Sequence, residues 1–289
     1  MDLYDADEVQ ADFSTLIGIL GRSFPHCERR CGGDEVREAA VTFCRKFAQH
    51  GISAQTLIRD GSAHRRWDKR FLDSPSVFVL TRAGWECFLL FYRVFVLPQS
   101  DAEREALYLR WCLESPRKRQ RYVETHLDQE QQKGREKEAI DSYRDRIRNN
   151  SWFQQRAAED RKEFLEGGDK WRGQWAALAR NAGIAALYGT SHYSWLCDQA
   201  HSGWFSIAGL GAAMSPDDSR NFLSSTIGML AIAAAKMLVG LDRLFPGSLV
   251  NLRSTERKVL DGWLTIARTT DAEIQQLLTE SAPSTEPLP

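Results

Sequence analysis

The sequence predicts an all-α protein, built as a multi-helix bundle. Apolar residues recur at helical spacing along most of the 289 residues, with no internal repeat and no run of alternating strands. Two segments, about 77–97 and 216–245, are much more apolar than the rest, so we expect them to be central helices around which the others pack. The hydrophobic fraction of 43% excludes a wholly disordered chain.

Residues 1–75 are predicted to form an N-terminal helical part. Apolar residues at helical spacing from Val9 onward indicate the first helix. Asp34 is a suitable N-cap for a second helix, and Gly51 is a suitable end for it. Ser53 is placed to cap a short third element before the chain enters a loop.

Residues 76–280 are predicted to form the main bundle, followed by a disordered tail over residues 281–289. The first central helix is expected to run over 77–97 and to be stopped by Pro98. Ser100 opens a capping box for the next helix, and Pro116 is expected to end that helix.

Residues 116–166 carry closely spaced charges of both signs, which is typical of solvated connector helices. Gly167 and Gly168 mark a break after them. Pro216 begins the second central helix, which Pro246 ends, and Ser254 is placed to cap the last helix.

Charge and patterning also bear on partners and location. The 38 basic and 39 acidic side chains leave a net charge of -1, which argues against a protein that binds nucleic acid or membrane through a global basic excess. The first residues lack the pattern of a secretory signal, and the six cysteines are scattered, so we expect reduced thiols and a cytoplasmic location. Residues 222–241 are long enough to span a bilayer, but Lys236 among them makes a buried helix the better interpretation, and we expect no membrane contact.

Cys27, Cys31, Cys44 and His50 have a spacing close to that of a zinc finger. Two observations favour structural cysteines instead. Cys44 lies on the apolar face of its helix, and His50 adjoins the glycine expected to end that helix. Zinc is therefore the alternative interpretation, and the sequence predicts no cofactor.

An Arg followed by a His after four residues resembles the motif of helical RNases of the HEPN class. In those enzymes, an Arg and a His on one helix face the scissile phosphate, where Arg stabilises negative charge and His moves a proton. Each match here is weak alone, because arginine is abundant in the chain. The matches are Arg45 with His50, Arg59 with His64, and Arg121 with His126.

The densest group of chemically useful residues joins two distant segments. Asp198 and His201 lie one turn apart on a predicted helix that begins near Tyr193, so Asp198 could orient His201 as a general base. Arg82 and Glu86 lie one turn apart within an apolar helix. We expect them to pair with each other or with a partner from another helix, because lone buried charges are costly.

The segments 81–86 (TRAGWE) and 193–202 (YSWLCDQAHS) resemble a mostly bacterial family of helical proteins known only as a domain of unknown function. That family has an R-x-x-x-E helix and a later Tyr-x-x-Leu-Ser/Cys-x-x-x-His-Ser motif. The resemblance covers roughly residues 75–245 and implies a helical bundle, but it implies no activity. Cys197 stands where serine is commoner. The candidate residues that it implies are Arg82, Glu86, Tyr193 and His201.

Our working prediction is a non-catalytic interaction or regulatory protein, with a protein partner or a second copy of the chain as its ligand. A buried network of Arg, Glu and His would then fix the register of the helices. A metal-dependent helical enzyme is disfavoured, because the sequence has none of the Glu-x-x-His pairs that bundle metal sites use.

The alternative is an HEPN-like RNase, or a related phosphoryl-transfer effector in bacterial defence. Arg82 and His201 would be its catalytic pair, oriented by Glu86 and Asp198, with Tyr193 nearby. The basic segment within 60–75, predicted to be a loop, would hold the RNA backbone and stack a base. Its candidate RNA-binding residues are Arg65, Arg66, Trp67, Lys69 and Arg70.

Overall fold

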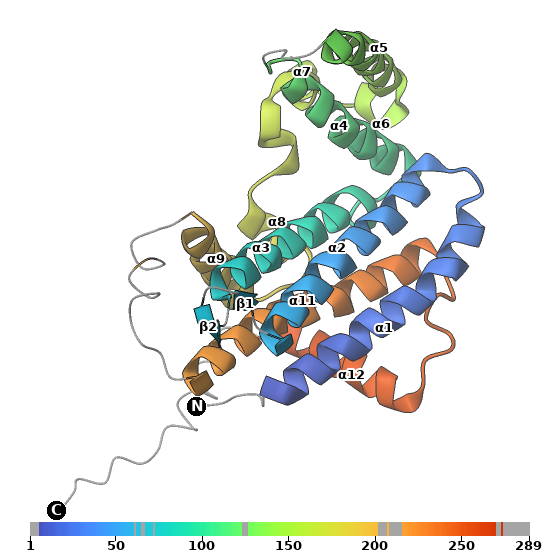
Figure 1. Cartoon of the computed structure of the whole chain (residues 1–289). Coiled ribbons are helices and arrows are strands. Elements are labelled where there is room, and N and C mark those ends of the chain that lie inside the picture. The colour runs from blue at the N-terminus through green and yellow to red at the C-terminus, as the bar shows by residue number, and fades with distance from the viewer. Residues whose placement is uncertain are drawn as a thin grey trace, which may run out of the picture.

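The computed structural model describes residues 6–60, 62–64, 67–71, 73–122, 127–201, 207, 216–269 and 273. These residues form a multi-helix bundle with one short hairpin, which confirms the predicted all-α class (Figure 1). The tail predicted over 281–289 lies outside the described residues.

Four long helices form the main bundle. They are α1 (Ala6–Cys31), α2 (Glu35–Asp60), α3 (Ser74–Phe91) and α11 (Pro216–Leu244), which lie side by side in Figure 1. The two central helices predicted from apolar content, α3 and α11, contact each other and are both packed against α2. Helices α1 and α2 bury their apolar faces in the same core, so the N-terminal part and the main bundle share one hydrophobic interior.

Helix α2 is continuous, so the prediction that it ends at Gly51 and that a new element begins at Ser53 was wrong. The glycine serves the packing of α1 on α2. A Cβ atom added at Gly51 would lie 2.4 Å from the ring of Phe13, which is fully buried. The sequence pattern indicated a helix end because glycine is common there, whereas here it allows close approach of a ring.

The first central helix is longer than predicted and changes its winding near its end. Asp73 caps α3 by accepting a hydrogen bond from the backbone N–H of Ser76 at 3.2 Å. The α-helix gives way to the π-helix η1 (Tyr92–Val96), so the helix predicted over 77–97 is present, and its last part is wound as a π-helix. A second π-helix, η3 (Leu187–His192), leads directly into α9 (Tyr193–Ala200).

The segment predicted to be a loop contains an antiparallel hairpin, β1 (Ser62–His64) with β2 (Trp67–Phe71). Its strands are too short for alternation to be visible in the sequence. β2 ends three residues before α3 begins, so the hairpin lies at the N-terminal end of that helix.

The charged region forms a group of shorter helices that packs on the end of the main bundle (Figure 1). It consists of α4 (Asp101–Arg119), α5 (Leu127–Asn149), α6 (Ser151–Gln154), α7 (Ala158–Glu166) and the 3₁₀-helix η2 (Gly168–Arg172). The N-cap at Ser100 is confirmed, since its hydroxyl accepts a hydrogen bond from the N–H of Glu103 at 3.1 Å. The carboxylate of Glu103 accepts from the N–H of Gln99 and not from that of Ser100, so the predicted capping box is not closed. Helix α4 ends at Arg119, so the expected end at Pro116 was wrong. The proline lies in the last turn of the helix.

One buried charge holds this group together. The side chain of Arg110 on α4 is 1% exposed, and its Nε atom donates to the carbonyl of Phe164 on α7 at 2.6 Å. A charge buried to this extent requires such acceptors, because burial without hydrogen bonds is costly.

Two further helices complete the fold. α8 (Trp175–Asn181) packs on α3 and precedes η3, while α12 (Ser254–Arg268) packs on α11 and α1. Helix α11 begins at Pro216, as predicted. Helix α12 begins at Ser254, but its N-cap is Arg253, so the prediction that Ser254 caps it was wrong. None of the helices in the described ranges is both long and apolar enough to cross a membrane.

We expect Gly51→Ala to lower the free energy of unfolding by about 1–3 kcal/mol, because the added methyl group overpacks against Phe13. Urea denaturation followed by circular dichroism measures the change. Gly134→Ala on α5 is the matched control, since a Cβ there meets no atom within 4 Å and alanine should stabilise the helix by about 0.5–1 kcal/mol. Equal effects of the two substitutions would contradict the packing role of Gly51.

Candidate functional site

Four of the five predicted catalytic residues meet where α3 packs against α9. The Nε atom of Arg82 donates to Oε1 of Glu86 at 2.9 Å, and the hydroxyl of Tyr193 donates to the same oxygen at 2.8 Å. The Nη1 atom of Arg82 lies 2.6 Å from Nε2 of His201. We call these four residues the Arg82 cluster; it joins residues more than 100 positions apart in the sequence.

The packing of the helices explains why these side chains meet. Arg82 and Glu86 lie one turn apart on the less buried stripe of α3, and their side chains are 23% and 29% exposed. The ring of Trp195 on α9 packs edge-on against Phe78 of α3, with ring centroids 4.7 Å apart. This contact sets α9 beside α3 and places both ends of α9, at Tyr193 and His201, within reach of the same stripe.

The electrostatics of the cluster keep its donors protonated. Burial, followed by the hydrogen bond to Glu86, raises the pKa of Tyr193, so its phenol stays neutral and donates. Burial alone would lower the pKa of Arg82, but the hydrogen bond and the charge of Glu86 raise it. A guanidinium only donates, so Nε2 of His201 accepts in this contact and the ring proton lies on Nδ1.

His201 is exposed to solvent, whereas Tyr193 is buried beneath it. The Nη2 atom of Arg82 makes no hydrogen bond to any described residue. The cluster therefore presents an imidazole and free guanidinium N–H groups outward, on a base of Glu86 and Tyr193. Such a surface can receive an anion from solvent.

The fifth predicted residue, Asp198, does not join the cluster. Within the described residues it forms no hydrogen bond or ion pair, so the expectation that it orients His201 was wrong. The expectation assumed helical spacing between the two, but His201 is the C-cap of α9, with φ of -102°. Cys197 was missed as a neighbour of the cluster: its hydrogen bond with Tyr193 adds to the raised pKa of that phenol.

The predicted RNA-binding residues lie partly outside the described chain. Arg65 and Arg66 are not among the described residues. Trp67, Lys69 and Arg70 lie on β2, whose backbone alone is described. Arg82 is eight residues into α3, which corresponds to roughly 12 Å along the helix from the end nearest the hairpin.

The cysteines of the zinc-like pattern lie in the interface between α1 and α2. Burial raises the pKa of the Cys27 thiol to about 12 and also raises the pKa of the Cys44 thiol. Both thiols therefore stay neutral and pack as small apolar side chains in the core. Over the described ranges, no three His, Cys, Asp or Glu side chains form a group that could hold a metal ion. The zinc interpretation of Cys27, Cys31, Cys44 and His50 therefore has no support in that part of the chain.

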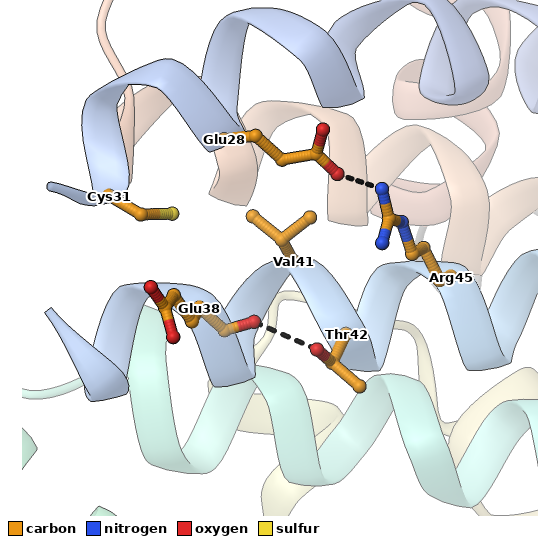
Figure 2. Close-up of a pocket in the computed structure, with 6 residues that line it drawn as sticks. All are labelled: Glu28, Cys31, Glu38, Val41, Thr42 and Arg45. Carbon is orange, nitrogen blue, oxygen red and sulfur yellow. Dashed lines mark hydrogen bonds and ion pairs between the residues drawn. The ribbon is translucent and has the colours of Figure 1, made fainter. Parts of the chain in front are cut away.

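A cavity of about 220 Å³ lies between α1 and α2, and Figure 2 shows the residues that line it. Arg45 forms an ion pair with Glu28 across this cavity and lies over the ring of Phe24. Arg45 therefore ties α2 to α1. It forms no hydrogen bond with His50, whose Nε2 atom is buried without a partner among the described residues. This arrangement argues against the first of the three Arg-x4-His pairs.

The other two Arg-x4-His pairs are incompletely described. Arg59 belongs to α2, but the side chain of His64 on β1 is not described, and His126 lies outside the described residues. The Arg and His that do meet, Arg82 and His201, come from different helices, so no local spacing motif identifies them.

Comparisons of the chain with protein-family models, with curated proteins and with solved structures found no match. The resemblance carried by segments 81–86 and 193–202 stays a prediction. The functional argument below therefore depends on the geometry of the Arg82 cluster alone.

We expect Cys197 to be the thiol that reacts fastest with an aromatic disulfide reagent at pH 8. It is partly exposed, whereas burial raises the pKa of Cys112 to about 11 and that of Cys87 to about 12. Cys197→Ala should remove the fast phase of labelling, and Cys112→Ala should retain it. A fast phase that persists in Cys197→Ala would show that this side of α9 is less accessible than described.

Proposed function

We propose that the protein is an RNase whose active site is the Arg82 cluster, with Arg82 and His201 touching the scissile phosphate. The observation that carries the proposal is the 2.6 Å contact between Arg82 Nη1 and the exposed imidazole of His201. Arg supplies charge for a phosphorane-like transition state, and His supplies a proton acceptor. The solvent-facing position of His201 favours a ligand site over a purely internal network.

The resting contact also suggests how substrate engages the site. A phosphodiester that accepts N–H groups from Arg82 competes with His201 for Nη1 and releases the Nε2 lone pair. The freed imidazole then accepts the proton of the ribose 2′-hydroxyl, while the 2′ oxygen forms a bond to phosphorus. The bond from phosphorus to the 5′ oxygen breaks, and that oxygen takes a proton from water. The products are a 2′,3′-cyclic phosphate and a 5′-hydroxyl end.

The remaining cluster residues position Arg82. Glu86 holds its Nε atom, and Tyr193 holds Glu86, so the guanidinium keeps one orientation as charge develops on the phosphate. The strand β2 carries Trp67, Lys69 and Arg70 and lies at the N-terminal end of α3. It would extend the contact of the Arg82 cluster with the RNA strand. We place this activity in the bacterial cytoplasm, as a defence effector.

We expect the purified protein to cleave a fluorescent single-stranded RNA, and His201→Ala to lower the rate by about 10²–10⁴-fold. Arg82→Lys should also lower the rate, because lysine keeps the charge but lacks the fork of donors. His192→Ala is the matched control, since this nearby histidine bonds to the carbonyl of Leu187 and lies outside the cluster. A DNA strand of the same sequence, which lacks the 2′-hydroxyl, should stay intact.

The same variants test the proposal in cells. Inducible expression of the wild type should slow growth and fragment RNA, and His201→Ala should do neither. Thermal unfolding of His201→Ala should match that of the wild type, because exposed side chains contribute little to stability. Intact RNA with the wild type, or equal cleavage by His201→Ala, would overturn the proposal.

A second candidate is the interaction protein of the working prediction, in which the cluster only fixes helix register. The observation in its favour is that one oxygen of Glu86 accepts from both α3 and α9. For this function we expect Tyr193→Phe to destabilise the fold by ~1 kcal/mol in urea and to weaken capture of a protein partner. A loss of RNA cleavage in Tyr193→Phe, with stability unchanged, would contradict it.

A further inference from the structure

A second cavity, of about 260 Å³, lies where the group of charged helices meets the end of α3. Its basic and aromatic walls are Arg93 from η1, Trp152 from α6, Arg156 from the turn after α6, and Trp171 from η2. Helix α7 adds Phe164 and two exposed carboxylates, Asp160 and Glu163. We call it the Arg93 cavity. Arg93 lies eleven residues beyond Arg82, or roughly 16 Å along the helix axis, so this cavity is separate from the Arg82 cluster.

Arg93 is a charged group with too few partners. Its only side-chain hydrogen bond to a described residue runs from Nη2 to the carbonyl of Trp171, at a long 3.4 Å. Burial lowers the pKa of Arg93, and the charge of Arg156 lowers it further, while Glu103 partly offsets both. The π-helix η1 carries this guanidinium, and π-turns are frequent at functional sites.

Arg156 faces the same cavity, and its partners satisfy its guanidinium only in part. Its Nε atom is buried without a hydrogen bond, and its guanidinium lies 4.7 Å from the ring centre of Trp152. Its ion pair with Asp160 is loose, at 3.6 Å, and the Asp160 side chain is 54% exposed. An oxyanion in the cavity could therefore take up the free donors of both arginines and relieve their mutual repulsion.

The cavity also offers flat surfaces. Trp171 is buried, and Trp152 packs against Phe164 with ring centroids 5.6 Å apart, so both indoles are held in place. One face of Trp152 is covered by Arg156, whose own outer face can stack on a planar ring. The volume lies just below the usual range of ligand pockets, which favours a ligand no larger than one nucleotide.

We propose that the Arg93 cavity binds a nucleoside monophosphate, with the phosphate on Arg93 and Arg156 and the base stacked on the Arg156–Trp152 pair. The phosphate would take the place of Asp160 beside Arg156, and the exposed side chains of Asp160 and Glu163 would turn to solvent. This proposal is independent of the RNase proposal, because it uses none of the residues of the Arg82 cluster.

Isothermal titration of the full chain with AMP, GMP, CMP and UMP tests the proposal, with inorganic phosphate and adenosine as separate probes. We expect at least one of the four nucleotides to bind, and both partial probes to bind roughly tenfold more weakly or not at all. Failure of all four nucleotides would overturn the proposal. Phosphate binding as tightly as a nucleotide would overturn recognition of the base.

Variants then locate the site. Arg93→Met and Arg156→Met should each weaken nucleotide binding roughly tenfold or more, because each removes charged donors to the phosphate. Arg161→Met is the matched control on α7, since Arg161 does not line the cavity, and it should bind like the wild type. Arg93→Lys, which keeps the buried stem and the charge, replaces Arg93→Met if that variant unfolds.

His201→Ala should bind the nucleotide unchanged, which separates this site from the RNase proposal. If nucleotide binding is lost in His201→Ala but retained in Arg93→Met and Arg156→Met, the nucleotide occupies the Arg82 cluster and the Arg93 cavity is not the site.

Discussion

The burial of α3 between α2 and α11 is the constraint on which the rest of the structure depends. Residues on three sides of α3 pack against these neighbours, and a Cβ atom added at Gly84 would lie 2.9 Å from Leu230 of α11. A helix enclosed in this way keeps one less buried stripe. Arg82, Glu86 and Arg93 all lie on it, so both sites described above follow from the packing of a single helix.

The elements that cover the stripe determine what each arginine meets. Near the start of α3 the neighbour is α9, which brings a phenol and an imidazole, and a carboxylate one turn away completes the set. Near the end, the neighbours are the segment from α6 to α7 and η2, which bring indoles, a second guanidinium and two exposed carboxylates. The two ends of one stripe thus acquire different chemistry because different elements cover them.

The main features of the fold could be predicted from the sequence because they depend on the amount of apolar surface. The two most apolar segments form α3 and α11, and the local start signals at Pro216 and Ser254 coincide with the first residues of α11 and α12. Gly51 and Pro116 were misinterpreted because local signals were taken as helix ends. The ring of Phe13 explains the glycine, and this contact between α1 and α2 is not visible in either segment alone.

The pairing of charged residues in the candidate site could be predicted from the sequence, because a buried charge requires a partner. Arg82 and Glu86 in an apolar helix had to be paired, and His201 was among the expected partners, but the hydrogen bond from Tyr193 to Glu86 was not foreseen. The Arg93 cavity was missed altogether. Its walls come from segments 59 to 78 residues away, and no spacing in the sequence connects η1 with Trp171.

Arg82 and Arg93 differ in the residue that lies four positions later on the same helix. Four residues after Arg82 stands Glu86, and four residues after Arg93 stands Leu97. The carboxylate raises the pKa of Arg82 and fixes its orientation, which suits a residue that must hold still while charge develops on a substrate. No carboxylate forms a hydrogen bond with Arg93 among the described residues, so burial lowers its pKa despite the charge of Glu103, and most of its donors are left to be satisfied from outside. An arginine already hydrogen-bonded to a carboxylate can position a reacting group, whereas one without such a bond is better suited to hold an anionic ligand.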